Sequence, residues 1–159
     1  MNIMGIDPGS AVTGYGVIRV KGNSAAWVDS GIIRTDSKDE LAGRLNTIYD
    51  GLSGVMVRHG PEWVCIEQAF YAKNVRTTLI LGHARGVAML AARKAGAMIE
   101  EYSARAIKQA LVGKGSATKE QVAYMVRVLV SPPDGHDQED ACDALAAALC
   151  GFSRIKARQ

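Results

Sequence analysis

Two short apolar runs that each end in a carboxylate constrain the fold of this chain most strongly. The first, residues 3–6, is followed by Asp7 and a Pro-Gly turn, and the second, residues 63–66, is followed by Glu67. Runs of this length suit buried strands, and apolar residues at helical spacing across 41–56 place a helix between them. Such a crossover makes the two strands parallel. If they are neighbours, Asp7 and Glu67 meet at the sheet edge where α/β proteins bind ligands.

The remaining pattern predicts an α/β fold with a five-stranded mixed sheet flanked by helices. We expect antiparallel strands at 12–20 and 25–35, a fifth short strand at 98–102, and helices at 41–59, 77–95, 103–111, 118–130 and 139–152. Ser37 to Glu40 has the form of a capping box for the first helix. Ser103 can cap the third helix, and Thr118 or Ser116 the fourth.

The helix at 77–95 is apolar around most of its circumference, and its Gly82 and Gly86 allow another backbone to approach closely. This pattern fits either a core helix or a subunit interface, and we favour the interface.

The chain of 159 residues suits one domain, which we place at 1–153, with a basic, frayed tail at 154–159. No apolar stretch is long enough to cross a bilayer, and the start lacks the pattern of a signal peptide. The three cysteines lie in apolar segments without metal-ligand spacing. These features predict a cytoplasmic protein with reduced thiols.

Charged residues are segregated along the chain. Basic residues without acids occupy 68–85, and five basic residues with one acid occupy 103–127, whereas acids gather at 36–40 and 134–143. Basic zones beside an acidic centre suit a polyanion held near carboxylates that bind cations.

Asp140 and Asp143 lie three residues apart on the last helix, so they share one face. Acids in the first turn can simply complement the helix dipole, which accounts for Asp140 better than for Asp143. Together with Asp7 and Glu67 they make four oxygen ligands, a set that favours Mg²⁺ or Mn²⁺ over zinc. Two such ions, about 4 Å apart, can promote hydrolysis of a phosphodiester bond.

The loop after Glu67 carries two aromatic residues, Phe70 and Tyr71. We favour a role in stacking on nucleic-acid bases, more strongly for Phe70 than for Tyr71, and the alternative is that they anchor the loop to the core. Lys73 and Arg76, which follow, are candidates for backbone phosphates.

Several motifs in this order resemble the RuvC family of Holliday-junction resolvases, within the ribonuclease H-like superfamily. The resemblance spans nearly the whole chain. It is carried by Gly5 to Ser10 with Thr13 to Gly16, by Ile66 to Gln68 with Phe70 and Ala72 to Asn74, by Leu81-Gly82 and Ala84 to Gly86, by the 108–116 segment, and by Asp140 to Ala146.

This resemblance implies a dimeric, Mg²⁺-dependent endonuclease that nicks four-way DNA junctions symmetrically in recombination and repair. It implies two Mg²⁺ ions per active site, with Mn²⁺ as a substitute, and a partner helicase complex of the RuvA and RuvB type. It assigns the catalytic and metal-binding roles to Asp7, Glu67, Asp140 and Asp143. It further implies that Lys108 and Lys119 lie near the scissile phosphate and that Phe70 probes the junction centre. From their residue types, Tyr71, Lys73, Arg76 and Lys114 are further candidates for contact with DNA.

Part of the family has histidine in place of the first late acid, whereas this chain has Asp140. Taken singly, Lys108 and Lys119 also fit a solvated helix face. Three other functions compete: a nuclease for structured RNA, an actin-like ATPase domain, for which the chain is too short, and a silent junction-binding protein, against which the complete set of acids argues.

Overall fold

A computed structural model describes residues 1–68 and 74–157, and its centre is a five-stranded sheet with the order β3-β2-β1-β4-β5. The strands are β1 (Asn2–Asp7), β2 (Val12–Lys21), β3 (Ser24–Arg34), β4 (Trp63–Glu67) and β5 (Met98–Tyr102). β1 to β3 form an antiparallel meander, and β4 and β5 continue the sheet in parallel with β1. The mixed sheet predicted from the sequence is confirmed.

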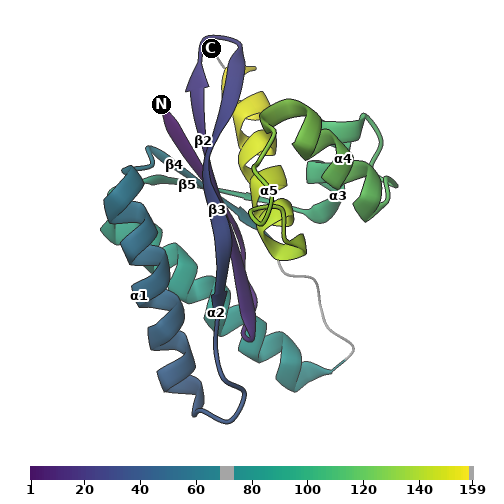
Figure 1. Cartoon of the computed structure of the whole chain (residues 1–159). Coiled ribbons are helices and arrows are strands. Elements are labelled where there is room, and N and C mark those ends of the chain that lie inside the picture. Colours follow the sequence, from purple (N-terminus) through teal and green to yellow (C-terminus); the bar gives the residue numbers. More distant parts are fainter. Residues whose placement is uncertain (69–73, 158–159) are drawn as a thin grey trace.

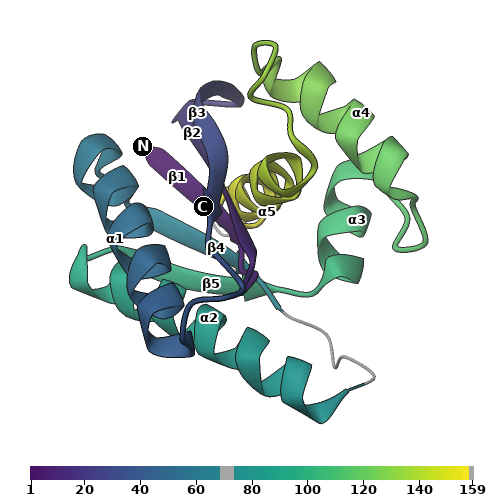
Figure 2. The ribbon, with the colours of Figure 1, turned by 60° about the horizontal axis from the view of Figure 1, so that its bottom comes forward.

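Helices cover both faces of this sheet. They are α1 (Leu41–His59), α2 (Val75–Lys94), α3 (Ala104–Val112), α4 (Lys119–Val130) and α5 (Glu139–Lys156). Figures 1 and 2 show α1 and α2 on one face and α3, α4 and α5 on the other. None of the helices in the described parts of the chain combines the length and apolarity needed to span a membrane.

Alternation along the strands divides the core into two layers. Ile3 and Cys65 pack with residues of α3, α4 and α5, whereas their neighbours Met4 and Val64 pack with residues of α1 and α2. Successive side chains of a strand point to opposite faces, so strands covered on both sides read as continuous apolar runs. This is why β1 and β4 are apolar almost to their last residue.

Two helix starts follow the predicted chemistry and one does not. The hydroxyl of Ser103 accepts a bond from the Ala106 N–H, and Thr118 forms a capping box with Gln121. The capping box predicted at Ser37 to Glu40 is wrong. The chain turns there instead, with the Asp36 carboxylate accepting from the Lys38 N–H at 2.8 Å, and Glu40 makes no side-chain cap.

The last helix is longer than the sequence indicates. α5 continues through Lys156, past the expected end at Phe152, because Ile155 lies on its apolar face and is only 5% exposed. Residues 154–156, assigned to the tail from the sequence, extend this helix.

Candidate active site

The two strand-end carboxylates lie on neighbouring strands. β1 and β4 pair in parallel with Ile6 opposite Ile66, so Asp7 and Glu67 follow the same paired position. Each strand ends at its acid because a turn or loop follows, and β1 is succeeded by Pro8-Gly9. The structure thus places Asp7 and Glu67 together at the carboxyl edge of the sheet, as the crossover argument predicts.

Helix α5 brings the other two acids to this edge by lying unusually close to the sheet. A Cβ atom placed on Gly5 of β1 would be 1.8 Å from the Ala144 carbonyl oxygen, and one on Gly14 of β2 would be 1.9 Å from that of Asp140. Only glycine leaves room for helix backbone at such separations. Sequence reasoning missed this role, although the small residues on both elements, Gly5, Gly14 and Ala144, were the available signal.

The resulting charge density shifts the ionisation of the acids. Burial and the nearby Asp143 and Asp140 carboxylates raise the pKa of Asp7 from 3.8 to about 6. Burial, Asp7 and Asp143 raise the pKa of Glu67 from 4.5 to about 7, and burial also raises the pKa of Asp143. Carboxylates that are crowded and desolvated in this way favour either a proton or a bound cation.

Two cavities meet at Glu67. One, of about 110 Å³, is lined by Glu67, Asp143 and both candidate lysines, Lys108 and Lys119. The other, of about 360 Å³, is lined by Asp7, Glu67 and Asp140. The four acids therefore line two cavities that share Glu67, and the lysines line one of the two.

Lys119 already interacts with one of the acids. Its Nζ atom lies 2.6 Å from the Glu139 carboxylate and 3.3 Å from that of Asp143. These contacts raise the pKa of Lys119, with the Glu139 hydrogen bond as the largest cause. Sequence reasoning did not single out Glu139, because nothing in the sequence shows which acid lies opposite the start of α4.

The donor set suits a hard divalent cation, because it consists of carboxylate oxygens. Within residues 1–68 and 74–157, however, no three acidic, histidine or cysteine side chains converge closely enough to form a ready-made metal cluster. Asp7, Glu67 and Asp140 line one cavity without closing on a common point. The residues thus fit Mg²⁺ or Mn²⁺ in an open site, where water and substrate oxygens complete the coordination.

The predicted DNA-contact residues are distributed around this site. Arg76 is exposed in the first turn of α2, and Lys114 is exposed just after α3. Phe70, Tyr71 and Lys73 lie outside the described residues. Arg85, from the same basic stretch, is paired instead with Glu101 through a bond of 2.7 Å from its Nε atom.

Comparison with known proteins shows which protein family has this architecture. The model of the family described as crossover junction endodeoxyribonuclease RuvC matches residues 3–151. A crossover junction endodeoxyribonuclease RuvC from Syntrophotalea carbinolica is 53% identical over 150 residues, which cover 94% of this chain and 92% of that protein. One from Legionella pneumophila is 51% identical over 148 residues, covering 93% and 84%.

Solved structures agree in fold. RuvC of Thermus thermophilus matches with a TM-score of 0.88 at 32% identity. The match covers 99% of this chain and 97% of the Thermus thermophilus chain. The same protein in complex with Holliday junction substrate has a TM-score of 0.93 at 32% identity, covering 99% and 96%. The ribonuclease H-like fold that the sequence predicts is confirmed, and the chain belongs to the RuvC family of crossover junction endodeoxyribonucleases.

Proposed function

We propose that this protein is a metal-dependent endonuclease that resolves four-way DNA junctions by paired symmetric nicks. One observation supports the proposal most strongly: four carboxylates, from β1, β4 and α5, lie at one edge of the sheet. The chain that carries them matches the RuvC family from residue 3 to residue 151. We assign Asp7, Glu67, Asp140 and Asp143 as the catalytic and metal-binding acids.

The acids and the lysines of this chain have different roles at a scissile phosphate. When bound, two Mg²⁺ ions, or Mn²⁺ in their place, supply an activated water and stabilise the leaving oxygen. Asp7 lines the same cavity as Glu67 and Asp140, and its pKa is raised by burial and by the charges of Asp143 and Asp140, so we assign it the bridging position. Lys108 and Lys119 line the adjoining cavity, where their charges stabilise a phosphate that gains negative charge in the transition state.

DNA contact is proposed for the basic residues around the acids. We assign Lys108, Lys114, Lys119 and Arg76 to backbone phosphates, contacts that fix the position of DNA without reading its sequence. For Phe70, Tyr71 and Lys73 the role in DNA binding remains the prediction made from the sequence. Cytoplasmic location and a junction-migrating RuvA and RuvB type of partner are likewise proposals that rest on family membership.

A homodimer through α2 is part of the proposal. Leu79 and Leu90 of this helix are 60% and 52% exposed, and they line an open groove together with Gly82 and Gly86. Nothing in the described chain lies within 4 Å of a Cβ atom placed on either glycine. An apolar helix face with small residues at its centre suits the close approach of a second copy.

A Leu90→Glu variant is expected to be monomeric, because a charge on this face would be desolvated in the dimer. Leu90 is half exposed in the single chain, so folding should be unaffected. Light scattering across a concentration series measures the change. Val57→Glu, at an 87% exposed apolar position on α1, is the matched control and should leave the mass unchanged. A Leu90→Glu dimer of wild-type strength would contradict the α2 interface.

Cleavage of a synthetic four-way junction tests the activity itself. We expect paired nicks with Mg²⁺ or Mn²⁺, no cleavage in EDTA, and little cleavage of a linear duplex of the same sequence. Binding should weaken steeply as salt rises, because phosphate contacts dominate. Preferential cleavage of an RNA hairpin would instead support the competing RNA nuclease function.

A further inference from the structure

The start of α5 must be fixed in space because Asp140 lies in its first turn. The residue before the helix, Gln138, makes no side-chain capping bond. Helix α5 rests on β2 through Gly14, but that contact prevents closer approach and does not hold the helix there. Core packing of Ala141 and the ion pairs of Lys119 hold one side of this turn. The segment 131–138, which joins α4 to α5, can supply a further attachment on the side of β3.

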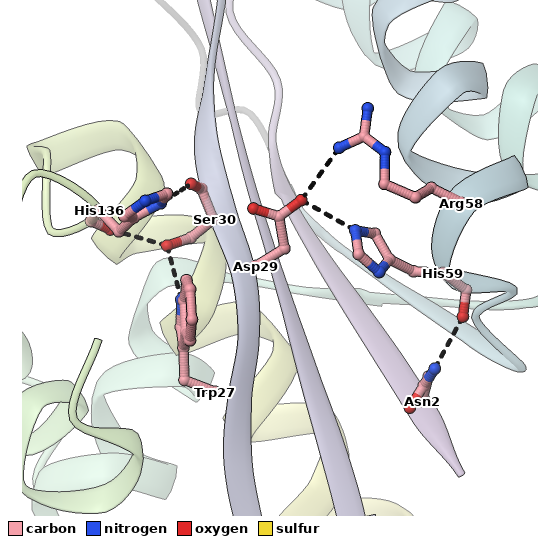
Figure 3. Close-up of polar contacts among 7 residues, drawn as sticks. All are labelled: Asn2, Trp27, Asp29, Ser30, Arg58, His59 and His136. Carbon is pink, nitrogen blue, oxygen red and sulfur yellow. Dashed lines mark hydrogen bonds and ion pairs between the residues drawn. The ribbon is translucent and has the colours of Figure 1, made fainter. Parts of the chain in front are cut away.

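His136 in this segment is bound to β3 by a reciprocal pair of hydrogen bonds (Figure 3). The Ser30 hydroxyl donates to the His136 carbonyl at 2.7 Å, and the His136 Nδ1 atom lies 2.8 Å from the Ser30 carbonyl oxygen. Because a carbonyl can only accept, Nδ1 is the donor. Ser30 is only 2% exposed, so competing water is excluded from the hydroxyl.

Trp27 completes this attachment. Its indole N–H donates to the Ser30 hydroxyl at 2.9 Å, which orients the hydroxyl proton toward His136. The Trp27 ring also meets the His136 ring edge to face, with centroids 5.1 Å apart. The histidine is thus held by one backbone contact, one ring nitrogen and one aromatic contact, all on the side of the sheet that carries α5.

We propose that His136 is a positioning residue that fixes the start of α5 and thereby the placement of Asp140 opposite Asp7. His136 lies four residues before Asp140 and attaches this part of the chain to β3. Gly14 determines how closely the first turn of α5 approaches β2. The inference rests on the proposed function, because it concerns the metal-binding acids. It predicts that loss of the His136 contacts weakens metal binding more than it weakens the fold.

A second histidine, at the end of α1, also binds a residue of β3 and offers a matched control. His59 binds Asp29, the residue before Ser30, with its Nε2 atom 2.8 Å from the carboxylate, and Arg58 reaches the same carboxylate at 3.4 Å. Figure 3 shows this group on the opposite side of β3 from His136. The His59 carbonyl is bound by Asn2, which begins β1 and so lies at the other end of that strand from Asp7.

The experiment compares His136→Ala, His136→Asn and His59→Ala by Mn²⁺ titration. Two readouts are taken: the Mn²⁺-induced rise in melting temperature without DNA, and the Mn²⁺ concentration for half-maximal junction cleavage. For His136→Ala we expect the Mn²⁺ requirement to rise by about 10-fold or more, the usual effect of removing a group that orients metal ligands. Asn carries a donor at the position of Nδ1, so His136→Asn should recover most of that loss. His59→Ala should lower the melting temperature and leave the Mn²⁺ requirement unchanged.

The outcomes separate this inference from the proposed function. An unchanged Mn²⁺ requirement in His136→Ala, with wild-type protein that binds Mn²⁺ and cleaves junctions, overturns the role of His136 alone. An equal rise in His59→Ala also overturns it, because the effect would then follow general destabilisation. Wild-type protein that neither binds Mn²⁺ nor cleaves overturns the proposed function, and this inference with it.

Discussion

An Asp7→Asn variant is expected to lose junction cleavage by roughly 10³-fold or more and yet to be more stable than the wild type at pH 7.5. The loss follows from Asp7's proposed bridging position, where an amide oxygen replaces a charged ligand. Junction binding should persist, since the phosphate contacts come from basic residues elsewhere. The gain in stability has a separate electrostatic origin.

The sign of the stability effect follows from the raised pKa values. Asp7 titrates at about 6 in the folded protein against 3.8 ordinarily, and Glu67 at about 7 against 4.5. The folded state therefore keeps protons that the unfolded state has already lost, and stability falls as pH rises from about 4 to 8. At pH 7.5 nearly all of the destabilisation from Asp7 is present, and Asp7→Asn removes it.

Thermal unfolding between pH 5 and pH 8, in EDTA, measures this effect. We expect the wild-type melting temperature to fall across this range, and the Asp7→Asn curve to be flatter and higher at pH 7.5 by about 2–8 °C, for a gain of about 1–2 kcal/mol. Asp39→Asn, at an exposed position in the turn before α1, is the control and should follow the wild type. A variant that loses cleavage, binding and stability together would show that Asp7 serves the fold instead.

Local pattern was sufficient to predict the strands and the sheet edge where Asp7 and Glu67 meet. Both acids follow apolar runs, and the helix between those runs fixes their parallel pairing. Pattern was not sufficient where a distant group decides the outcome. Ile155 extends α5 because it meets the core. The capping box expected before α1 failed for a different, local reason, because the Asp36 carboxylate accepts from the Lys38 N–H in a turn there.

Contacts between distant segments also explain what was missed in the site. Glu139 was overlooked because only the packing of α4 beside α5 places Lys119 against it. Ser30 lies 106 positions from His136 in the sequence, and neither residue carries a local signal that would connect them. The role of the glycines of β1 and β2 becomes visible only when the backbone of α5 lies across them.

A Gly14→Ala variant is expected to lose about 100-fold in cleavage, the effect expected when catalytic groups move by about 1 Å. The new Cβ atom would lie 1.9 Å from the Asp140 carbonyl oxygen and 2.4 Å from its carbon. Both are backbone atoms, so no side-chain rotation relieves the clash, and the first turn of α5 has to move away from β2. Asp140 moves with it.

The loss of stability in Gly14→Ala shows whether the variant has a displaced active site or is unfolded. Overpacking of this kind costs about 1–3 kcal/mol, which a domain of this size tolerates. We therefore expect cooperative unfolding at a lower temperature, junction binding near the wild-type level, and an increased Mn²⁺ requirement for the remaining cleavage. Gly54→Ala on α1 is the matched control, because nothing lies within 4 Å of its added Cβ atom, and it should be neutral or slightly stabilising. Full activity in Gly14→Ala would show that the close seating of α5 on β2 is not what brings Asp140 to the other acids.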